Sequence, residues 1–135
     1  MKKYWTIFFT TVLGFFSCQQ KSNFESEKQN QIEANQKVIN VLRDGGDKLI
    51  ISRNVFHWVY FKSETQKDNY LKEVTTKGFE LVSSNKVDDK FPFQIQIKRI
   101  DKVDKESVDE YVIYLWEKAR EFSGEYDGWE TSIEK

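Results

Sequence analysis

Cysteine and histidine, two residue types that often carry chemistry, each occur once in the chain, as Cys18 and His57. One cysteine cannot form a disulfide within the chain, and one cysteine with one histidine does not make a zinc site. The pair Gly45-Gly46 lacks the spacing and the Lys-Ser/Thr ending of a phosphate-binding loop. The sequence therefore predicts no metal and no cofactor, and it offers no pair of a nucleophile and a base.

Cys18 stands where a lipid-modified cysteine is expected. The chain starts with Met1-Lys2-Lys3, residues 4–16 carry no charge, and the small residue Ser17 directly precedes Cys18. The uncharged stretch is shorter than the ~18–20 apolar residues that span a bilayer, as in a signal peptide. Residues 15–18 resemble a bacterial lipobox, in which a peptidase cuts before a cysteine that receives lipid, although Phe15 occupies the usual leucine position.

We accordingly predict a lipoprotein signal peptide over residues 1–17 and a membrane-anchored protein of the cell envelope, on its periplasmic or surface side. More than one acyl chain on Cys18 would anchor the protein stably. The polar residues 18–31 would form a flexible tether. A plain signal peptide or short anchor with an incidental cysteine is the alternative.

His57 lies in a pattern that favours a core position. It alternates with Val55 and Val59 along a strand-like segment, and a histidine in such a row is more often a hydrogen-bonded core residue than a general base. The sequence therefore predicts that the protein is not an enzyme. A small envelope enzyme remains an alternative, and it would depend on His57.

The elements that position these residues follow from hydrophobic periodicity and from cap and turn residues. We expect one domain over residues 32–135, beginning with a helix that ends at Arg43. Both faces of the first strand are apolar, so we expect both to be covered. Ser63 predicts a helix start, and Gly78 a helix end. The subsequent elements are a strand over 54–61, a helix over 63–78, strands over 79–82 and 91–100, a helix between Asp104 and Gly124, and a strand over 126–133.

This order predicts an α+β fold, the ferredoxin-like split β-α-β-β-α-β sandwich, with an extra N-terminal helix on an edge or across the open face. RNA-recognition domains share this pattern, but the net charge of −1 and the pI of about 5.9 do not suit nucleic-acid binding. Rings occur on one strand of the expected face and not on its neighbour: Phe56, Trp58 and Tyr60 against Gln94, Gln96 and Lys98. We expect no direct nucleic-acid binding.

Tyr126-Asp127-Gly128-Trp129 is the segment whose composition most needs an explanation. Asp-Gly between two aromatic residues is typical of a turn or a β-bulge. In the structural interpretation, which we favour, Gly128 permits the bulge and Trp129 caps the core. In the functional interpretation the two rings are anchors for a partner.

The same segment, extended to Thr131, resembles the signature near the end of the RraB family, regulators that inhibit ribonuclease E. Gly46-Asp47, residues 53–61 and Lys77-Gly78-Phe79 are also similar to that family, so the resemblance spans about residues 35–133. It implies a ferredoxin-like fold and a non-catalytic domain that binds a protein partner, whose identity is unknown. An export signal would separate the chain from a cytoplasmic ribonuclease. A genuine cytoplasmic regulator of ribonuclease E remains the alternative.

Overall fold

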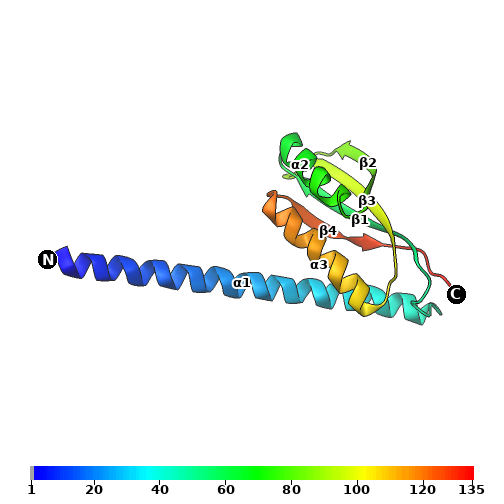
Figure 1. The fold of residues 1–135 in the computed structure, drawn as a ribbon, viewed down its shortest axis with the longest axis horizontal. Coiled ribbons are helices and arrows are strands. Elements are labelled where there is room, and N and C mark those ends of the chain that lie inside the picture. The colour runs from blue at the N-terminus through cyan, green and yellow to red at the C-terminus, as the bar shows by residue number, and fades with distance from the viewer. Residues whose placement is uncertain (1) are drawn as a thin grey trace. The chain divides into compact units, whose positions relative to one another are not determined.

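The structure, a computed structural model, describes residues 2–135, with side chains from Cys18 onward. These residues form three helices and four strands (Figure 1), which are α1 (Lys2–Asp44), β1 (Arg53–Phe61), α2 (Glu64–Thr75), β2 (Glu80–Lys86), β3 (Phe93–Asp101), α3 (Lys105–Glu121) and β4 (Glu125–Glu130). The chain divides into two compact units, Met1–Ala34 and Asn35–Lys135.

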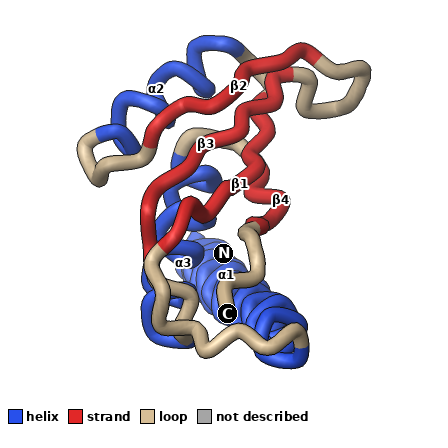
Figure 2. Tube along the Cα trace, turned by 90° about the vertical axis from the view of Figure 1, so that its right-hand side faces the viewer, coloured by secondary structure: helices blue, strands red, loops and turns tan. Residues whose placement is uncertain are grey.

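The second unit contains one antiparallel sheet with the strand order β2-β3-β1-β4. Helix α2 connects β1 to β2, and α3 connects β3 to β4. Figure 2 shows α2 and α3 on the same side of the strands. This arrangement confirms the predicted α+β fold, a ferredoxin-like split β-α-β-β-α-β sandwich with an additional N-terminal helix.

The core lies between the sheet and these two helices. Alternate residues of β1 face it, and α3 contributes residues at helical spacing. The buried side chains of β1 and α3 include Val55, Val59, Phe61, Val108, Val112, Leu115 and Ala119. We call this side of the sheet the covered face.

The expectation that both faces of β1 are covered is wrong. Phe56, Trp58 and Tyr60 point away from the helices and are only half-buried. The reason lies in the two helical connections, β1-α2-β2 and β3-α3-β4, each of which joins a pair of parallel strands. Both are right-handed crossovers, and they run in opposite directions along the sheet from strands of opposite direction, so both helices lie on the same side. The other side is left as an open face.

The predicted starts of α2 and α3 and the predicted end of α2 are confirmed by the contacts and backbone angle of Ser63, Asp104 and Gly78. The Ser63 hydroxyl accepts a hydrogen bond from the Gln66 backbone N–H at 3.2 Å, and the Asp104 carboxylate accepts one from Ser107 N–H at 3.1 Å. Gly78 adopts a φ of 86° after α2. Strand β2 continues to Lys86, beyond the predicted end, because an edge strand can pair with β3 while its polar side chains stay in water.

Residues 18–31 are helical within α1, not irregular as expected for a flexible tether. The segment has no glycine or proline, and glutamine, glutamate and lysine are good helix formers. Gln29 Nε2 donates to Glu33 Oε1 one turn later, at 3.4 Å. The limits 1–17, 18–31 and 32–135 stay predictions. Across the part of the chain that the structure describes, no helix combines the length and apolarity needed to cross a membrane.

The last turns of α1, from Asn35 to Asp44, belong to the second unit and pack at one edge of it. Ile39 and Leu42 are buried there. The Asn35 amide donates to Asp109 of α3 at 3.0 Å and accepts from the Trp129 indole of β4 at 3.1 Å. Of the two positions expected for the leading helix, the edge is therefore the one observed for these residues.

Candidate functional site

Tyr126 and Trp129 both lie on the covered face, with 7% and 9% of their surface exposed. They are three residues apart, and side chains three apart on a regular strand point to opposite faces. A bulge in β4 resolves this conflict. Trp58 pairs with Gly128 and Val59 with Tyr126, so Asp127 is the extra residue between them. The two rings therefore contribute to the core, as the structural interpretation expects.

The middle residues of this segment have a different position. Gly128 adopts a φ of 148°, which a residue with a side chain rarely takes, and it lies opposite Trp58. Asp127 is exposed and lines a hollow beside Tyr60. Within one tetrapeptide, the structure therefore directs Tyr126 and Trp129 inward and Asp127 to the open face.

His57 is a core residue with no exposed surface. Its Nδ1 atom lies 2.8 Å from the Tyr126 hydroxyl, and the rings of Phe79 and Tyr111 meet it edge-on at 5.7 and 5.5 Å. Burial lowers the pKa of His57 to about 3, and the charge of Arg99 acts in the same direction. The imidazole is therefore neutral at physiological pH and cannot reach a substrate in solution.

Asp47 and Arg53, which lie in the segments that resemble the family, form a buried ion pair. Arg53 Nη2 donates to Asp47 Oδ1 at 3.0 Å, and Arg53 Nη1 donates to the Ser132 carbonyl at 3.0 Å. Asp47 also accepts from the backbone N–H groups of Leu49 and Glu134. The hydrogen bond from Arg53 lowers the pKa of Asp47 well below its usual range, and the two N–H groups act in the same direction, against burial. This pair fixes the C-terminal segment to the start of β1.

The open face carries the side chains that remain available to a partner. Phe56, Trp58 and Tyr60 follow one another along β1, and we call them the aromatic stripe. Gln94 Nε2 donates to the Tyr60 hydroxyl at 2.8 Å, which fixes that ring. The neighbouring positions of β3 and β4 are polar, apart from Gly128: Gln94, Gln96 and Lys98 on one side, and Glu125, Gly128 and Glu130 on the other.

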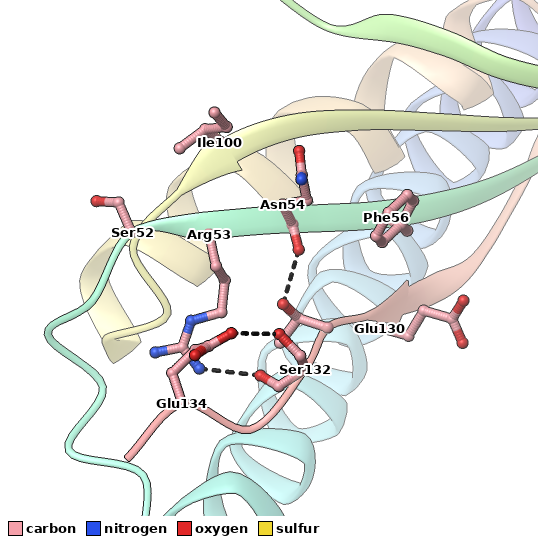
Figure 3. Close-up of a pocket in the computed structure, with 9 residues that line it drawn as sticks. Ser52, Arg53, Asn54, Phe56, Ile100, Glu130, Ser132 and Glu134 are labelled. Carbon is pink, nitrogen blue, oxygen red and sulfur yellow. Dashed lines mark hydrogen bonds between the residues drawn. The ribbon is translucent and has the colours of Figure 1, made fainter.

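A hollow lies at each end of the aromatic stripe. The first has a volume of about 570 Å³ and is lined by Phe56 and Ile100 together with Glu130 and Glu134 (Figure 3). Two hydrogen bonds hold the C-terminal segment at this hollow: Arg53 Nη1 donates to the Ser132 carbonyl, and the Thr131 hydroxyl donates to the Asn54 carbonyl.

The second hollow, of about 260 Å³, lies at the Tyr60 end of the aromatic stripe. Its lining consists of Tyr60, Asp89, Lys90, Phe91, Glu125 and Asp127. Among the side chains from Cys18 onward, no group of three or more His, Cys, Asp or Glu residues is placed to hold a metal ion. The arrangement is suited to contact with a partner through rings and carboxylates.

A family model described as Regulator of ribonuclease activity B matches residues 32–131, which include all four strands, α2 and α3. The chain belongs to the RraB family. The predicted family is thus confirmed, and membership places the domain among regulatory, non-catalytic protein-binding domains. A comparison with curated proteins gives no match. The segments that carried the resemblance contribute to both parts of the domain. Tyr126, Trp129 and the ion pair of Asp47 and Arg53 are buried, whereas Asp127 and the aromatic stripe lie on the open face.

Proposed function

We propose that this protein is a membrane-anchored lipoprotein that presents an RraB-family domain in the cell envelope and regulates a protein partner by binding it, without catalysis. The observation that carries regulation by binding is the aromatic stripe. Tryptophan and tyrosine are enriched among the residues that contribute most of the binding energy at protein interfaces, and rings that are still partly exposed gain when a partner excludes water from them. Here Trp58 and Tyr60 lie on a face that neither α2 nor α3 covers.

Anchoring is supported by the N-terminal sequence. The basic residues Lys2 and Lys3, the uncharged residues 4–16 and the pair Ser17-Cys18 stand in the order that lipid attachment requires. The Cys18 side chain is exposed and free of a disulfide. A polar segment follows it and separates the acylated position from the domain.

Anchoring is tested by the intact mass of the protein recovered from membranes of its native host. We expect a mass that corresponds to the chain from Cys18 with lipid attached. Cys18→Ser should release a folded protein from the membrane fraction, whereas Ser22→Ala, the matched control four residues later, should change nothing. A Cys18→Ser protein that still fractionates with membranes would contradict the proposal.

Regulation by binding is tested with a photo-crosslinking amino acid placed at Trp58 of the full chain in its native host. We expect a discrete crosslinked partner from this position and none from Glu106, an exposed residue at the start of α3. The partner's own activity, assayed with and without the purified protein, should change. Equal crosslinking from the two positions would contradict an interface on the open face.

A second candidate is a cytoplasmic regulator of ribonuclease E. The family match over residues 32–131 favours it, because that family is described as regulating ribonuclease activity. A full-length, unmodified mass in the soluble fraction, together with binding to purified ribonuclease E, would make this the leading function.

A further inference from the structure

We propose, building on the function above, that the aromatic stripe binds a basic protein segment in extended conformation. Two Lys or Arg side chains of that segment would enter the two end hollows, and the residue midway between them would lie over Trp58. The charge of the hollows, the rings that line them and the distance between them support this assignment.

The first hollow is acidic. Glu130 and Glu134 line it, and its one cationic side chain, Arg53, is already paired with Asp47. Glu134 accepts a hydrogen bond from the Ser132 hydroxyl at 2.8 Å, and neither glutamate forms an ion pair within the described part of the chain. A cation that enters this hollow therefore meets two carboxylates without an ion-pair partner, in a lining that also contains the Phe56 ring.

The second hollow has the same character. Asp89, Glu125 and Asp127 line it together with one cation, Lys90, and a second cation, Lys62, lies close to Phe91 of the same lining. The domain already places ammonium groups over a ring here, since Lys62 Nζ and Lys90 Nζ lie 5.2 and 5.7 Å from the centre of Phe91. Cations over aromatic rings are favourable, more so when a partner displaces water. The three carboxylates outnumber these two cations, so the hollow keeps a negative charge that suits a Lys or Arg side chain of a partner.

The distance between the hollows sets the spacing of the two cations. Phe56 belongs to the first hollow and Tyr60 to the second, and four residues of a strand rise about 13 Å. On an extended partner segment, residues i and i+4 point to the same side and are separated by the same distance. Trp58, midway between the hollows and opposite Gly128, faces residue i+2, for which an apolar side chain is suited.

The same charges argue against two other ligand classes. Phosphates of nucleic acid or of an anionic membrane would approach four carboxylates, those of Glu125, Asp127, Glu130 and Glu134. The cations beside the aromatic stripe are fewer: Lys98 opposite Phe56, and Lys62 and Lys90 at Phe91. A basic segment has the opposite sign and gains from each of these carboxylates. Electrostatic complementarity of this kind mainly sets specificity and the rate of association.

The test is a fluorescence-anisotropy titration of the full chain, held in an uncharged detergent, with a labelled Arg-Thr-Val-Thr-Arg peptide. The comparison peptide carries citrulline, which has the shape of arginine without its charge, at both ends. We expect citrulline to weaken binding about tenfold, and 0.5 M salt to weaken the arginine peptide similarly. Trp58→Ala should weaken it by about tenfold or more.

The decisive pair of variants removes equal charge from opposite faces. Asp127→Asn with Glu130→Gln should weaken the arginine peptide about tenfold. Asp68→Asn with Glu106→Gln, on α2 and α3, is the matched control and should leave its affinity unchanged. Circular dichroism checks that each variant is folded.

Equal affinity of the two double variants would overturn the inference, as would tighter binding to phosphatidylglycerol vesicles or to single-stranded RNA than to the peptide. An absence of peptide binding, combined with a partner crosslinked from Trp58, would overturn the basic segment and leave the proposed function standing. If no partner were crosslinked from Trp58, that result would count against the proposed function itself.

Discussion

The Nδ1 atom of His57 lies 2.8 Å from the phenol oxygen of Tyr126, and this hydrogen bond joins β1 to β4 inside the core. Both side chains are buried, so neither group can exchange its partner for water. The His57 Nε2 atom has no hydrogen-bond partner among the described residues. The pair thus links the edge strand β4, which contains the signature segment, to the central strand β1.

Removing either partner of this pair should cost more than removing both. His57→Phe leaves the Tyr126 hydroxyl buried without a partner, and Tyr126→Phe leaves Nδ1 without one, at about 1–3 kcal/mol each. In the double variant both polar groups are gone and the rings are retained, so its loss should be smaller than the sum. Urea denaturation of the four proteins measures the coupling. Strictly additive losses would show that the hydrogen bond contributes nothing.

The buried imidazole also predicts that the protein loses stability in mild acid. The pKa of His57 is about 3 in the folded state and about 6.5 in the unfolded chain, so between these values only the unfolded chain binds the proton. The free energy of unfolding should therefore decrease as pH falls below about 6.5, with a slope that approaches 1.4 kcal/mol per pH unit. Above pH 7 this contribution is complete.

Urea midpoints at pH 7.5, 6.0 and 4.5 measure this slope. The double variant His57→Phe with Tyr126→Phe is the control, since it lacks the titrating group, and its slope between pH 6 and 4.5 should be shallower. The same slope in both proteins would mean that other groups determine the acid sensitivity.

Periodicity and cap residues were sufficient to predict most of the fold. The alternation in residues 54–61, the caps Ser63 and Asp104, and the helix end at Gly78 all correspond to observed contacts. The predicted element order corresponds to the observed split β-α-β-β-α-β fold, whereas the expected coverage of both faces of β1 was wrong. Residues 18–31 were misjudged because polar composition indicates solvent exposure and not the absence of a helix.

The candidate site was less predictable, for a reason visible in β4. Its bulge shifts the alternation by one residue, so the side chain of Asp127 emerges beside Tyr60 while Tyr126 and Trp129 both turn inward. The Asp-Gly pair indicated a bulge, but a pattern with a period of two does not show which residue is the extra one, and therefore which side chains change face. The three rings of β1 were visible in the sequence, but hydrophobicity alone could not tell a covered face from a binding face.

Two tryptophans on opposite faces of the sheet should respond differently to truncation. Trp129 is buried and its indole donates to Asn35, so Trp129→Ala should destabilise the protein by about 3–5 kcal/mol. Trp58 is half-exposed on the open face, and Trp58→Ala should cost about 1–2 kcal/mol. Thermal or urea unfolding compares them directly. A Trp129→Ala protein as stable as Trp58→Ala would contradict the core position of Trp129.

The buried pair of Asp47 and Arg53 should be costly to break and partly dispensable as a whole. Arg53→Met leaves the Asp47 carboxylate buried without its counter-charge, at about 3–5 kcal/mol. Adding Asp47→Leu removes that charge and should restore part of the loss. Recovery should be incomplete, because Asp47 also accepts from the N–H groups of Leu49 and Glu134, which lose their partner.

Urea denaturation of the two single variants and the double variant measures this recovery. Lys105→Met, which breaks the ion pair between Lys105 and Asp109 on α3, is the comparison and should cost about 1 kcal/mol or less, because the Lys105 side chain is 56% exposed. If Arg53→Met behaved like Lys105→Met, the link between β1 and the C-terminal segment would rest on the apolar contacts of that segment and not on the ion pair.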